Sequence, residues 1–298
     1  MTRLLLIGRN GQVATALREQ APQHPDFELD VLARPEIDLA EAEGLARQVA
    51  ERRPAIVVNA AAYTAVDRAE SEPDLAGRIN AQAVGELAAG AQAAGAAFIH
   101  LSTDYVFDGT GTHAWTPDDA TAPLGVYGRT KRAGEQAAIA RCDRTLIIRT
   151  AWVFSPFGRN FVKTMLGLGA QRDTLHVVAD QYGNPTSAID IARGVWAAAT
   201  ALAQGRDEGY GIFHLVGENA TNWADFAREI FRQAGLGGRT GVEVISIPSA
   251  DYPTPAERPA NSRLDASDFH RVFGFRCARW QDALAEVLRR LDEPPYGA

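Results

Sequence analysis

The chain has 298 residues, 46% hydrophobic and 22% charged, which is enough to bury a large core in one α/β domain or in a core with a smaller lobe. Its formal net charge of −7 argues against a nucleic-acid-binding protein, which normally presents a basic face. Two distant cysteines and six scattered histidines argue against a disulfide framework and against a metal site, so we expect no bound metal.

Short apolar runs alternate with Ala-rich helical patterns through most of the chain. Repeated strand–helix alternation with strands that are apolar almost throughout indicates a parallel sheet covered by helices on both faces. The predicted fold class is therefore α/β, with a doubly wound parallel sheet of the Rossmann type. The expected strands are 4–8, 27–33, 55–59, 97–102 and 145–149, and the expected helices are 12–20, 40–52, 74–94 and 127–140.

The pattern changes after residue 149, where loops become richer in Pro, Gly and Asn. A helix over 189–203 and a strand over 211–216 look like more of the sheet domain, whereas amphipathic helices over 222–233 and 280–291 indicate a smaller C-terminal lobe. We therefore expect a Rossmann domain over 1–150, together with roughly 175–220. The smaller lobe is expected over 151–174 and 221–298.

A glycine-rich turn joins the first strand to the first helix. Residues 8–14 read G-x-x-G-x-x-A directly after the strand. Glycine lets the backbone turn tightly and lets a phosphate approach it, and the N–H groups of the following helix favour a pyrophosphate. The turn therefore predicts dinucleotide binding, with an ordinary glycine-rich turn as the alternative.

The end of the second strand bears on the choice of cofactor. An acidic residue there normally binds the ribose 2′-hydroxyl, but the sequence reads Leu32-Ala33-Arg34. A guanidinium suits a 2′-phosphate, and Arg9 in the glycine turn could assist. This favours NADPH, with NADH possible because Asp38 is near and with a solvated Arg34 as the alternative.

Three residues carry the predicted chemistry. Thr103 follows a strand, and Tyr127 and Lys131 lie four apart on a predicted helix, so they share one face. A carbonyl that is being reduced needs a proton, and tyrosine, with a pKa of about 10, is a slow donor unless a nearby ammonium lowers that pKa. Thr103 can orient the carbonyl oxygen. The Tyr-x-x-x-Lys spacing is common by chance, but its order after the glycine turn and Thr103 favours a reductase site.

These residues resemble those of the extended short-chain dehydrogenase/reductases, and within them the branch that reduces dTDP-4-dehydrorhamnose. The resemblance spans nearly the full length. Its specific segments are 8–13, 57–67 (VVNAAAYTAVD), 69–73 (AESEP), 102–107 (STDYVF), 127–131, 149–153 (RTAWV), 160–166 (NFVKTML), 180–186 (DQYGNPT) and 258–264 (RPANSRL).

The resemblance implies hydride transfer from NADPH or NADH to the C4 ketone of dTDP-4-dehydro-β-L-rhamnose, the last step of dTDP-L-rhamnose biosynthesis. It implies that Tyr127 donates the proton, that Lys131 lowers its pKa and holds the nicotinamide ribose, and that Thr103 orients the carbonyl. The expected cofactor contacts, besides Tyr127 and Lys131, are Gly8, Asn10, Gly11, Gln12, Val13, Arg34, Asp38, Leu39, Ala61, Ala62 and Tyr63. The expected substrate contacts in the smaller lobe and at the strand ends are Thr103, Asp104, Tyr105, Trp152, Asn160 and Arg258, the last two with loop anchoring as the alternative.

The chain also departs from the family. Some members are dimers bridged by magnesium through glutamates, but the matching positions here are Ala16 and Ile189, which cannot ligate a metal. We expect no bridging magnesium, and a monomer or homodimer. No secretory or membrane-length apolar segment is visible, so we expect a cytoplasmic protein with a nucleotide sugar as its ligand and no nucleic-acid or membrane partner.

Three other functions remain as alternatives. A nucleotide-sugar 4,6-dehydratase needs an acid pair after the threonine, and here Asp104 is followed by Tyr105. Another nucleotide-sugar reductase or an epimerase would keep the same three residues. A non-catalytic regulatory subunit would have no need of the intact set Thr103, Tyr127 and Lys131.

Overall fold

The computed structural model describes residues 1–235 and 241–292. Its centre is a six-stranded sheet in the order β10-β5-β4-β3-β1-β2, and every neighbouring pair in it is parallel. From β1 the chain first adds β2 on one side and then adds β3, β4, β5 and β10 on the other. The strand order therefore reverses between β1 and β3, and ligands bind at this point in folds of this kind. The strands are β1 (Thr2–Ile7), β2 (Phe27–Leu32), β3 (Ile56–Asn59), β4 (Ala97–Thr103), β5 (Thr145–Thr150) and β10 (Gly211–His214).

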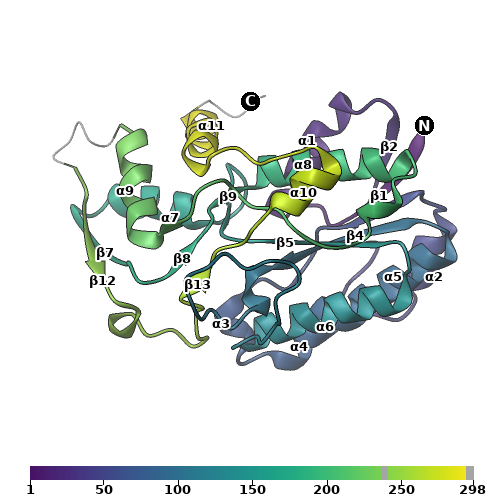
Figure 1. Cartoon of the computed structure of the whole chain (residues 1–298), viewed down its shortest axis with the longest axis horizontal. Coiled ribbons are helices and arrows are strands. Elements are labelled where there is room, and N and C mark those ends of the chain that lie inside the picture. Colours follow the sequence, from purple (N-terminus) through teal and green to yellow (C-terminus); the bar gives the residue numbers. More distant parts are fainter. Residues whose placement is uncertain (236–240, 293–298) are drawn as a thin grey trace.

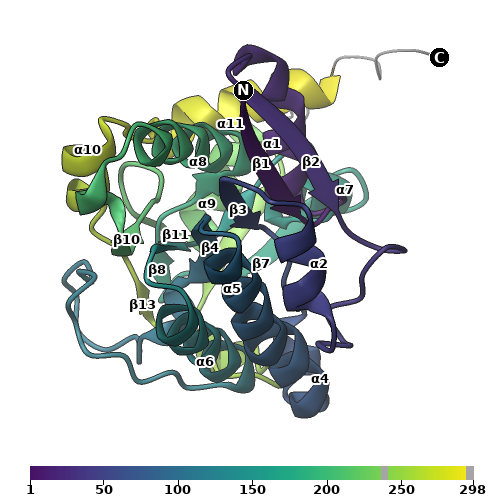
Figure 2. The ribbon, with the colours of Figure 1, turned by 90° about the vertical axis from the view of Figure 1, so that its right-hand side faces the viewer.

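Helices cover both faces of this sheet, which explains why its central strands are largely apolar and buried. In β1, Leu4 and Leu6 belong to the core on one face, and Leu5 and Ile7 belong to the core on the other. Figures 1 and 2 show the two helical layers on opposite sides of the strands. One layer holds α1 (Gln12–Gln20), η1 (Ala21–Gln23), α8 (Ala188–Ala203), η4 (Asp207–Gly209) and α10 (Ser267–Phe273), and the other holds α2 (Leu45–Glu51), α3 (Val66–Ala69), α4 (Pro73–Gly77), α5 (Ala83–Ala93) and α6 (Val126–Arg141). This confirms the predicted fold class.

The helix predicted over 74–94 is interrupted. Between α4 and α5 the backbone widens into a π-helical turn, η2 (Arg78–Gln82). The turn packs against α6 so closely that a Cβ on Gly134 would lie 2.0 Å from the carbonyl oxygen of Asn80. The side chain of Asn80 accepts a hydrogen bond from the Tyr63 amide at 2.8 Å and donates to Thr130 at 3.1 Å. The interruption therefore ties the loop after β3 to α6.

The smaller lobe lies at one end of the sheet, where Figure 1 shows α7, α9 and the β7–β12 pair. A separate apolar core holds it together, with Phe226, Ile230 and Leu284 fully buried. Its helices are α7 (Phe161–Gly169), α9 (Trp223–Gln233) and α11 (Trp280–Asp292). Its strands and single turns are β6 (Val153–Phe154), β7 (Thr174–Val178), β8 (Tyr182–Gly183), β9 (Thr186–Ser187), β11 (Thr221–Asn222), β12 (Glu243–Ile247), β13 (Asn261–Ser262), η3 (Asp104–Val106) at the boundary, and η6 (Ser249–Asp251).

The structure differs from the predicted division on both sides of the boundary. Three strands expected in the sheet domain lie in the smaller lobe: β7 pairs with β12 and places Leu175 and Val177 in the core of that lobe, and β8 and β9 pair with β13 and β6. Helix α10, expected in the smaller lobe, packs Phe269 and Phe273 into the core of the main sheet. The predicted lobe also includes 236–240 and 293–298, which lie outside the described residues.

Candidate active site

The glycine turn has the geometry that a bound pyrophosphate requires. Gly8 has a φ of 109°, which residues with a Cβ rarely adopt. A Cβ on Gly8 would lie 3.2 Å from the Cβ of Ala61, so the loop after β3 lies close against the turn. Helix α1 begins after Gly11 without a side-chain cap, which leaves the amides of its first turn free to bind an anion.

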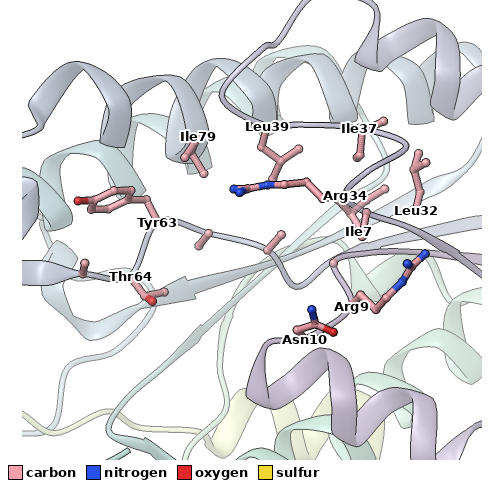
Figure 3. A pocket seen from close by; sticks show the side chains of 15 residues that line it. Ile7, Arg9, Asn10, Leu32, Arg34, Ile37, Leu39, Tyr63, Thr64 and Ile79 are labelled. Atoms are coloured by element: carbon pink, nitrogen blue, oxygen red, sulfur yellow. The ribbon is translucent and has the colours of Figure 1, made fainter. Parts of the chain in front are cut away.

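A cavity of about 450 Å³ opens beside this turn, at the point where the strand order reverses. Seven of the residues predicted to bind cofactor lie on its wall: Gly8, Asn10, Arg34, Leu39, Ala61, Ala62 and Tyr63. Figure 3 shows Arg34 extending across the cavity in the direction of Ile79 and Tyr63, whereas Arg9 and Asn10 rise from the glycine turn. The structure therefore brings most of the predicted cofactor contacts together.

Six predicted cofactor residues are not on the wall of this cavity: Gly11, Gln12, Val13, Asp38, Tyr127 and Lys131. Gly11 and Val13 open α1. Gln12 faces the smaller lobe, where its Oε1 accepts hydrogen bonds from Ser155 Oγ at 2.7 Å and from Asn160 Nδ2 at 3.1 Å. Asp38 accepts a hydrogen bond from the Ala40 amide at 2.9 Å. The backbone of the turn thus remains available to a pyrophosphate, but the side chain of Gln12 joins the two parts of the molecule.

Both arginines near the adenine end of the cavity have acidic partners. Arg9 lies 3.2 Å from Glu36, and Arg34 lies 3.6 Å from Asp38 with 73% of its side chain exposed. The Arg9 guanidinium helps to lower the pKa of Glu36, although a backbone hydrogen bond contributes more. Exposed ion pairs of this kind stabilise a protein little, so each guanidinium can exchange its partner for a phosphate.

Thr103 and Tyr127 meet at the carboxyl end of β4. The Thr103 hydroxyl donates a hydrogen bond to Asp104 Oδ1 at 2.9 Å and accepts one from the Tyr105 amide at 3.3 Å. Burial raises the pKa of Tyr127 to about 12, a hydrogen bond with Thr103 opposes this rise, and the charge of Asp104 adds to it. Tyr127 is therefore held in its protonated form and is a weaker acid than a free tyrosine.

Lys131 is held on the β4 side of the site. Its Nζ donates a hydrogen bond to the Leu101 carbonyl at 2.6 Å and lies 3.2 Å from His100 Nε2. Burial lowers the pKa of Lys131 to about 8, against the charge of Glu135, which raises it. The shared helical face brings the two residues to one site, but the amine is bound to β4 and does not touch the phenol.

Asp104 and Tyr105 complete the wall beside Tyr127. The Tyr105 and Tyr127 rings lie edge to face with their centroids 5.4 Å apart, and burial raises the pKa of Tyr105. Burial likewise raises the pKa of Asp104 to about 6, and hydrogen bonds with Ser262 and Thr103 oppose this rise. Its Oδ2 is buried without a hydrogen-bond partner among the described residues. Such an oxygen is suited to accept a hydrogen bond from a ligand hydroxyl.

Trp152 stands at the entrance to the smaller lobe in an unusual conformation. Its φ of 47° is rare for a residue with a side chain. Its ring packs over Gly183, where a Cβ would lie 2.6 Å from Trp152 Cε2, and stacks on Trp223 with centroids 3.5 Å apart. Sequence reasoning did not find Trp223, although an aromatic residue at the start of an amphipathic helix next to a loop is a usable signal.

Two predicted substrate contacts are engaged in anchoring. Asn160 caps α7 through a hydrogen bond from the Lys163 amide, and its Nδ2 binds Gln12 and two loop carbonyls. Arg258 makes two hydrogen bonds of 2.9 Å to Asp67. The structure gives Asn160 the alternative, anchoring role. Arg258 lies close enough to Tyr105 for its charge to oppose the rise that burial causes in the pKa of that phenol, so it borders the site.

A buried ion pair fixes the helix that carries Tyr127 and Lys131. Glu135 on α6 binds Arg149 on β5 through two hydrogen bonds of 2.9 and 2.8 Å, and Ser102 on β4 donates to the same carboxylate at 2.5 Å. The side chains of Glu135 and Arg149 are 0% and 1% exposed. Gly128 on the same helix approaches η3, the turn after β4, so closely that a Cβ there would lie 2.2 Å from the Tyr105 carbonyl oxygen. Sequence reasoning did not assign Glu135, although its place one turn after Lys131 was a signal.

The described residues contain neither a cluster suited to a metal ion nor a membrane-spanning helix. Within 1–235 and 241–292, no cluster of three or more His, Cys, Asp or Glu side chains is arranged to hold a metal ion. Ala16 and Ile189 are buried apolar residues on α1 and α8. No helix over the same ranges is both long and apolar enough to cross a membrane.

A Rossmann sheet with a glycine turn at its first strand and Thr103, Tyr127 and Lys131 at its carboxyl edge defines a short-chain dehydrogenase/reductase. The model of the RmlD substrate binding domain family matches residues 1–293, so the chain belongs to that family. A dTDP-4-dehydrorhamnose reductase from Sinorhizobium fredii is 46% identical over 288 residues, which are 96% of each chain. One from Salmonella typhimurium is 44% identical over 97% of each chain.

Solved structures agree with this assignment. A dTDP-4-dehydrorhamnose reductase from Clostridium acetobutylicum superposes with a TM-score of 0.90 at 35% identity, covering 98% of this chain and all of the other. One from Bacillus anthracis, solved in complex with NADP, gives 0.88 at 32% identity and covers 97% of this chain. A dTDP-glucose 4,6-dehydratase from Streptomyces venezuelae, at 22% identity, shares the fold alone.

Proposed function

We propose that this chain reduces the C4 ketone of dTDP-4-dehydro-β-L-rhamnose to give dTDP-β-L-rhamnose, with NADPH as the preferred cofactor and NADH as a possible one. The observation that carries the proposal is the intact set of Thr103, Tyr127 and Lys131 beside the dinucleotide cavity. Relatives over nearly the whole chain bear the name of this reductase. Tyr105, which stands where a dehydratase has its second acid, favours simple reduction.

The cavity fits a dinucleotide. The glycine turn leaves a cradle that a Cβ on Gly8 would partly fill, and the free amides of α1 suit the pyrophosphate. Leu39 would flank the adenine, and Ala61 and Tyr63 would line the path toward Thr103. When bound, the cofactor supplies the hydride for the reduction.

The residues of the chain then supply a proton and hold the ketone. Thr103 and Tyr127 present their hydroxyls at one point, so both can bind the carbonyl oxygen. Tyr127 donates its phenolic proton to this oxygen as negative charge develops there. Burial keeps the pKa of Tyr127 at about 12, so the acid stays protonated near neutral pH until the ketone needs the proton. A positive charge on Lys131 favours the phenolate that remains.

The surrounding residues suit a nucleotide sugar. The unpartnered Oδ2 of Asp104 can accept a hydrogen bond from a sugar hydroxyl, and the stacked rings of Trp152 and Trp223 provide an apolar surface in the smaller lobe. Arg258 can exchange Asp67 for a diphosphate oxygen. We propose that the smaller lobe binds this substrate, and that the enzyme works in the cytoplasm as a monomer or homodimer.

The direct test is an assay with the purified full-length chain. We expect NADPH absorbance to fall when dTDP-4-dehydrorhamnose is added, because the ketone accepts two electrons from each cofactor. dTDP-glucose has no ketone at C4 and serves as the matched control, with no change in absorbance. A stable NADPH signal with the keto-sugar at high enzyme concentration would rule out the proposed reaction.

The preference for NADPH is predicted to depend on Arg34. Replacing Arg34 with Ala should lower the ratio of kcat/KM for NADPH to kcat/KM for NADH by about 10- to 100-fold, the effect of losing a hydrogen bond to a charged group. Arg47→Ala is the matched control, because Arg47 forms a similar exposed pair with Glu51 four residues later and lies outside the cavity. If Arg34→Ala leaves the ratio at its original value, Arg34 does not bind the 2′-phosphate.

A further inference from the structure

A chain of buried polar side chains lies behind Lys131 and is not part of the reduction described above. Asn59 ends β3, His100 lies in β4, and both are 0% exposed. The Ala61 amide donates to Asn59 Oδ1 at 3.1 Å, and Asn59 Nδ2 lies 3.1 Å from His100 Nδ1. On the other side of the ring, His100 Nε2 lies 3.2 Å from Lys131 Nζ. The chain of contacts thus runs from the cofactor loop to the lysine.

The hydrogen bond between Ala61 and Asn59 determines the direction of the hydrogen bonds that follow it. A backbone N–H can only donate, so the carbonyl oxygen of Asn59 must face Ala61 and its NH₂ group must face His100. His100 Nδ1 is therefore the acceptor. Burial lowers the pKa of His100 well below its usual value, and the charge of Lys131 lowers it further, so the ring is neutral. A neutral imidazole carries one proton, which must then be on Nε2, facing Lys131.

A protonated Nε2 affects the charge of the lysine. An ammonium group has only donors, so it cannot accept a hydrogen bond from the His100 N–H, whereas a neutral amine can accept it with its lone pair. The contact with His100 therefore favours the uncharged amine. Among the described residues, the charge that acts on Lys131 is that of Glu135 on its own helix, which favours the ammonium and is itself paired with Arg149 on β5.

We propose that His100, oriented by Asn59, is a positioning residue that donates a hydrogen bond to Lys131 and controls the balance between its amine and ammonium forms. The inference rests on the proposed function, in which the ammonium of Lys131 is the active form. Because His100 favours the amine, Lys131 loses its proton at a lower pH than it would without this hydrogen bond. The pH above which activity falls is lower for the same reason. Weakening its N–H donor should therefore move this limit to higher pH.

The position of the imidazole proton can be measured without any catalysis. A long-range ¹H–¹⁵N correlation spectrum of the ¹⁵N-labelled full-length chain shows which ring nitrogen carries the proton. The signals of His100 are identified by their loss in His100→Phe, with His176→Gln, an exposed histidine on β7, as the control for assignment. We expect the proton on Nε2 at neutral pH. A proton on Nδ1, or on both nitrogens, would overturn the proposal even if the enzyme were fully active.

The effect on Lys131 is tested with Asn59→Asp. A carboxylate has two acceptor oxygens, so it can keep the Ala61 hydrogen bond and also accept one from His100 Nδ1. The imidazole proton then moves to Nδ1, and Nε2 becomes an acceptor for the ammonium. We expect the alkaline limb of the kcat/KM profile to move upward by roughly one pH unit.

His100→Phe provides a second test, because it removes the N–H donor while keeping a buried ring. It should also move the limb upward, whereas a purely structural role would lower stability and leave the limb in place. An unchanged limb in whichever of the two variants folds would overturn the proposal. Absence of turnover in the wild type would instead contradict the proposed function and leave the spectrum interpretable.

Discussion

Replacing Tyr127 with Phe is expected to lower kcat by about 10²- to 10⁴-fold, the usual contribution of a positioned proton donor. Phenylalanine keeps the ring that packs edge to face with Tyr105 but removes the hydroxyl hydrogen-bonded to Thr103. The dinucleotide cavity has no wall residue from α6, so NADPH affinity should change little. Steady-state kinetics and a titration of NADPH fluorescence measure the two effects separately.

The matched control is Tyr252→Phe, because Tyr252 is 60% exposed on the smaller lobe and outside the site. Its kcat should equal that of the wild type. Turnover by Tyr127→Phe within a few-fold of the wild-type value would show that another group donates the proton. Loss of NADPH binding in the same variant would indicate that Tyr127 acts mainly on the cofactor.

Glu135→Gln is expected to lower the free energy of unfolding by about 3–5 kcal/mol, the cost of leaving one member of a buried ion pair without its partner. Arg149 would remain buried and charged, and its Nη1 already lacks a hydrogen-bond partner among the described residues. Urea unfolding followed by circular dichroism gives the free energy directly.

Two further variants separate the possible explanations. Glu86→Gln breaks the partly exposed pair between Glu86 and Arg141 at the end of the same helix, and should cost less than about 1 kcal/mol. The double variant Glu135→Leu/Arg149→Met removes both charges and should recover most of the lost stability, because apolar replacements of buried pairs are often neutral. If Glu135→Gln were as stable as the wild type, the pair would not be what holds α6 to the sheet.

Features that depend on local sequence were predictable. Helix α1 was expected over 12–20 and is found at Gln12–Gln20, because the glycine turn and the apolar spacing that define it are adjacent in the chain. The shared face of Tyr127 and Lys131 follows from helical geometry in the same way. Family membership and the proposed reaction came from motifs of this local kind, and the relatives agree with both.

Features that depend on distant partners were not predictable. Nothing in the residues of β7 specifies that they pair with β12, at Glu243–Ile247. His100 lies 31 residues before Lys131 on another element, so helical spacing could not indicate which groups the lysine would bind. The same reason explains Arg258 and Asn160, whose partners Asp67 and Gln12 are distant in sequence. Their residue types marked these side chains as candidates, but only the tertiary structure shows which residues they hydrogen-bond to.

The two glycines of α6 have a consequence for how this sequence can vary. Gly128 and Gly134 lie on either side of Lys131, and each faces a backbone carbonyl oxygen at a distance that no side chain allows. Even alanine at either position would push the helix outward and carry Tyr127 with it. A displacement of about 1 Å in a reacting group can cost about 100-fold in rate. Natural selection should therefore preserve these two residues as strictly as the tyrosine, although neither has a side chain that could take part in the chemistry.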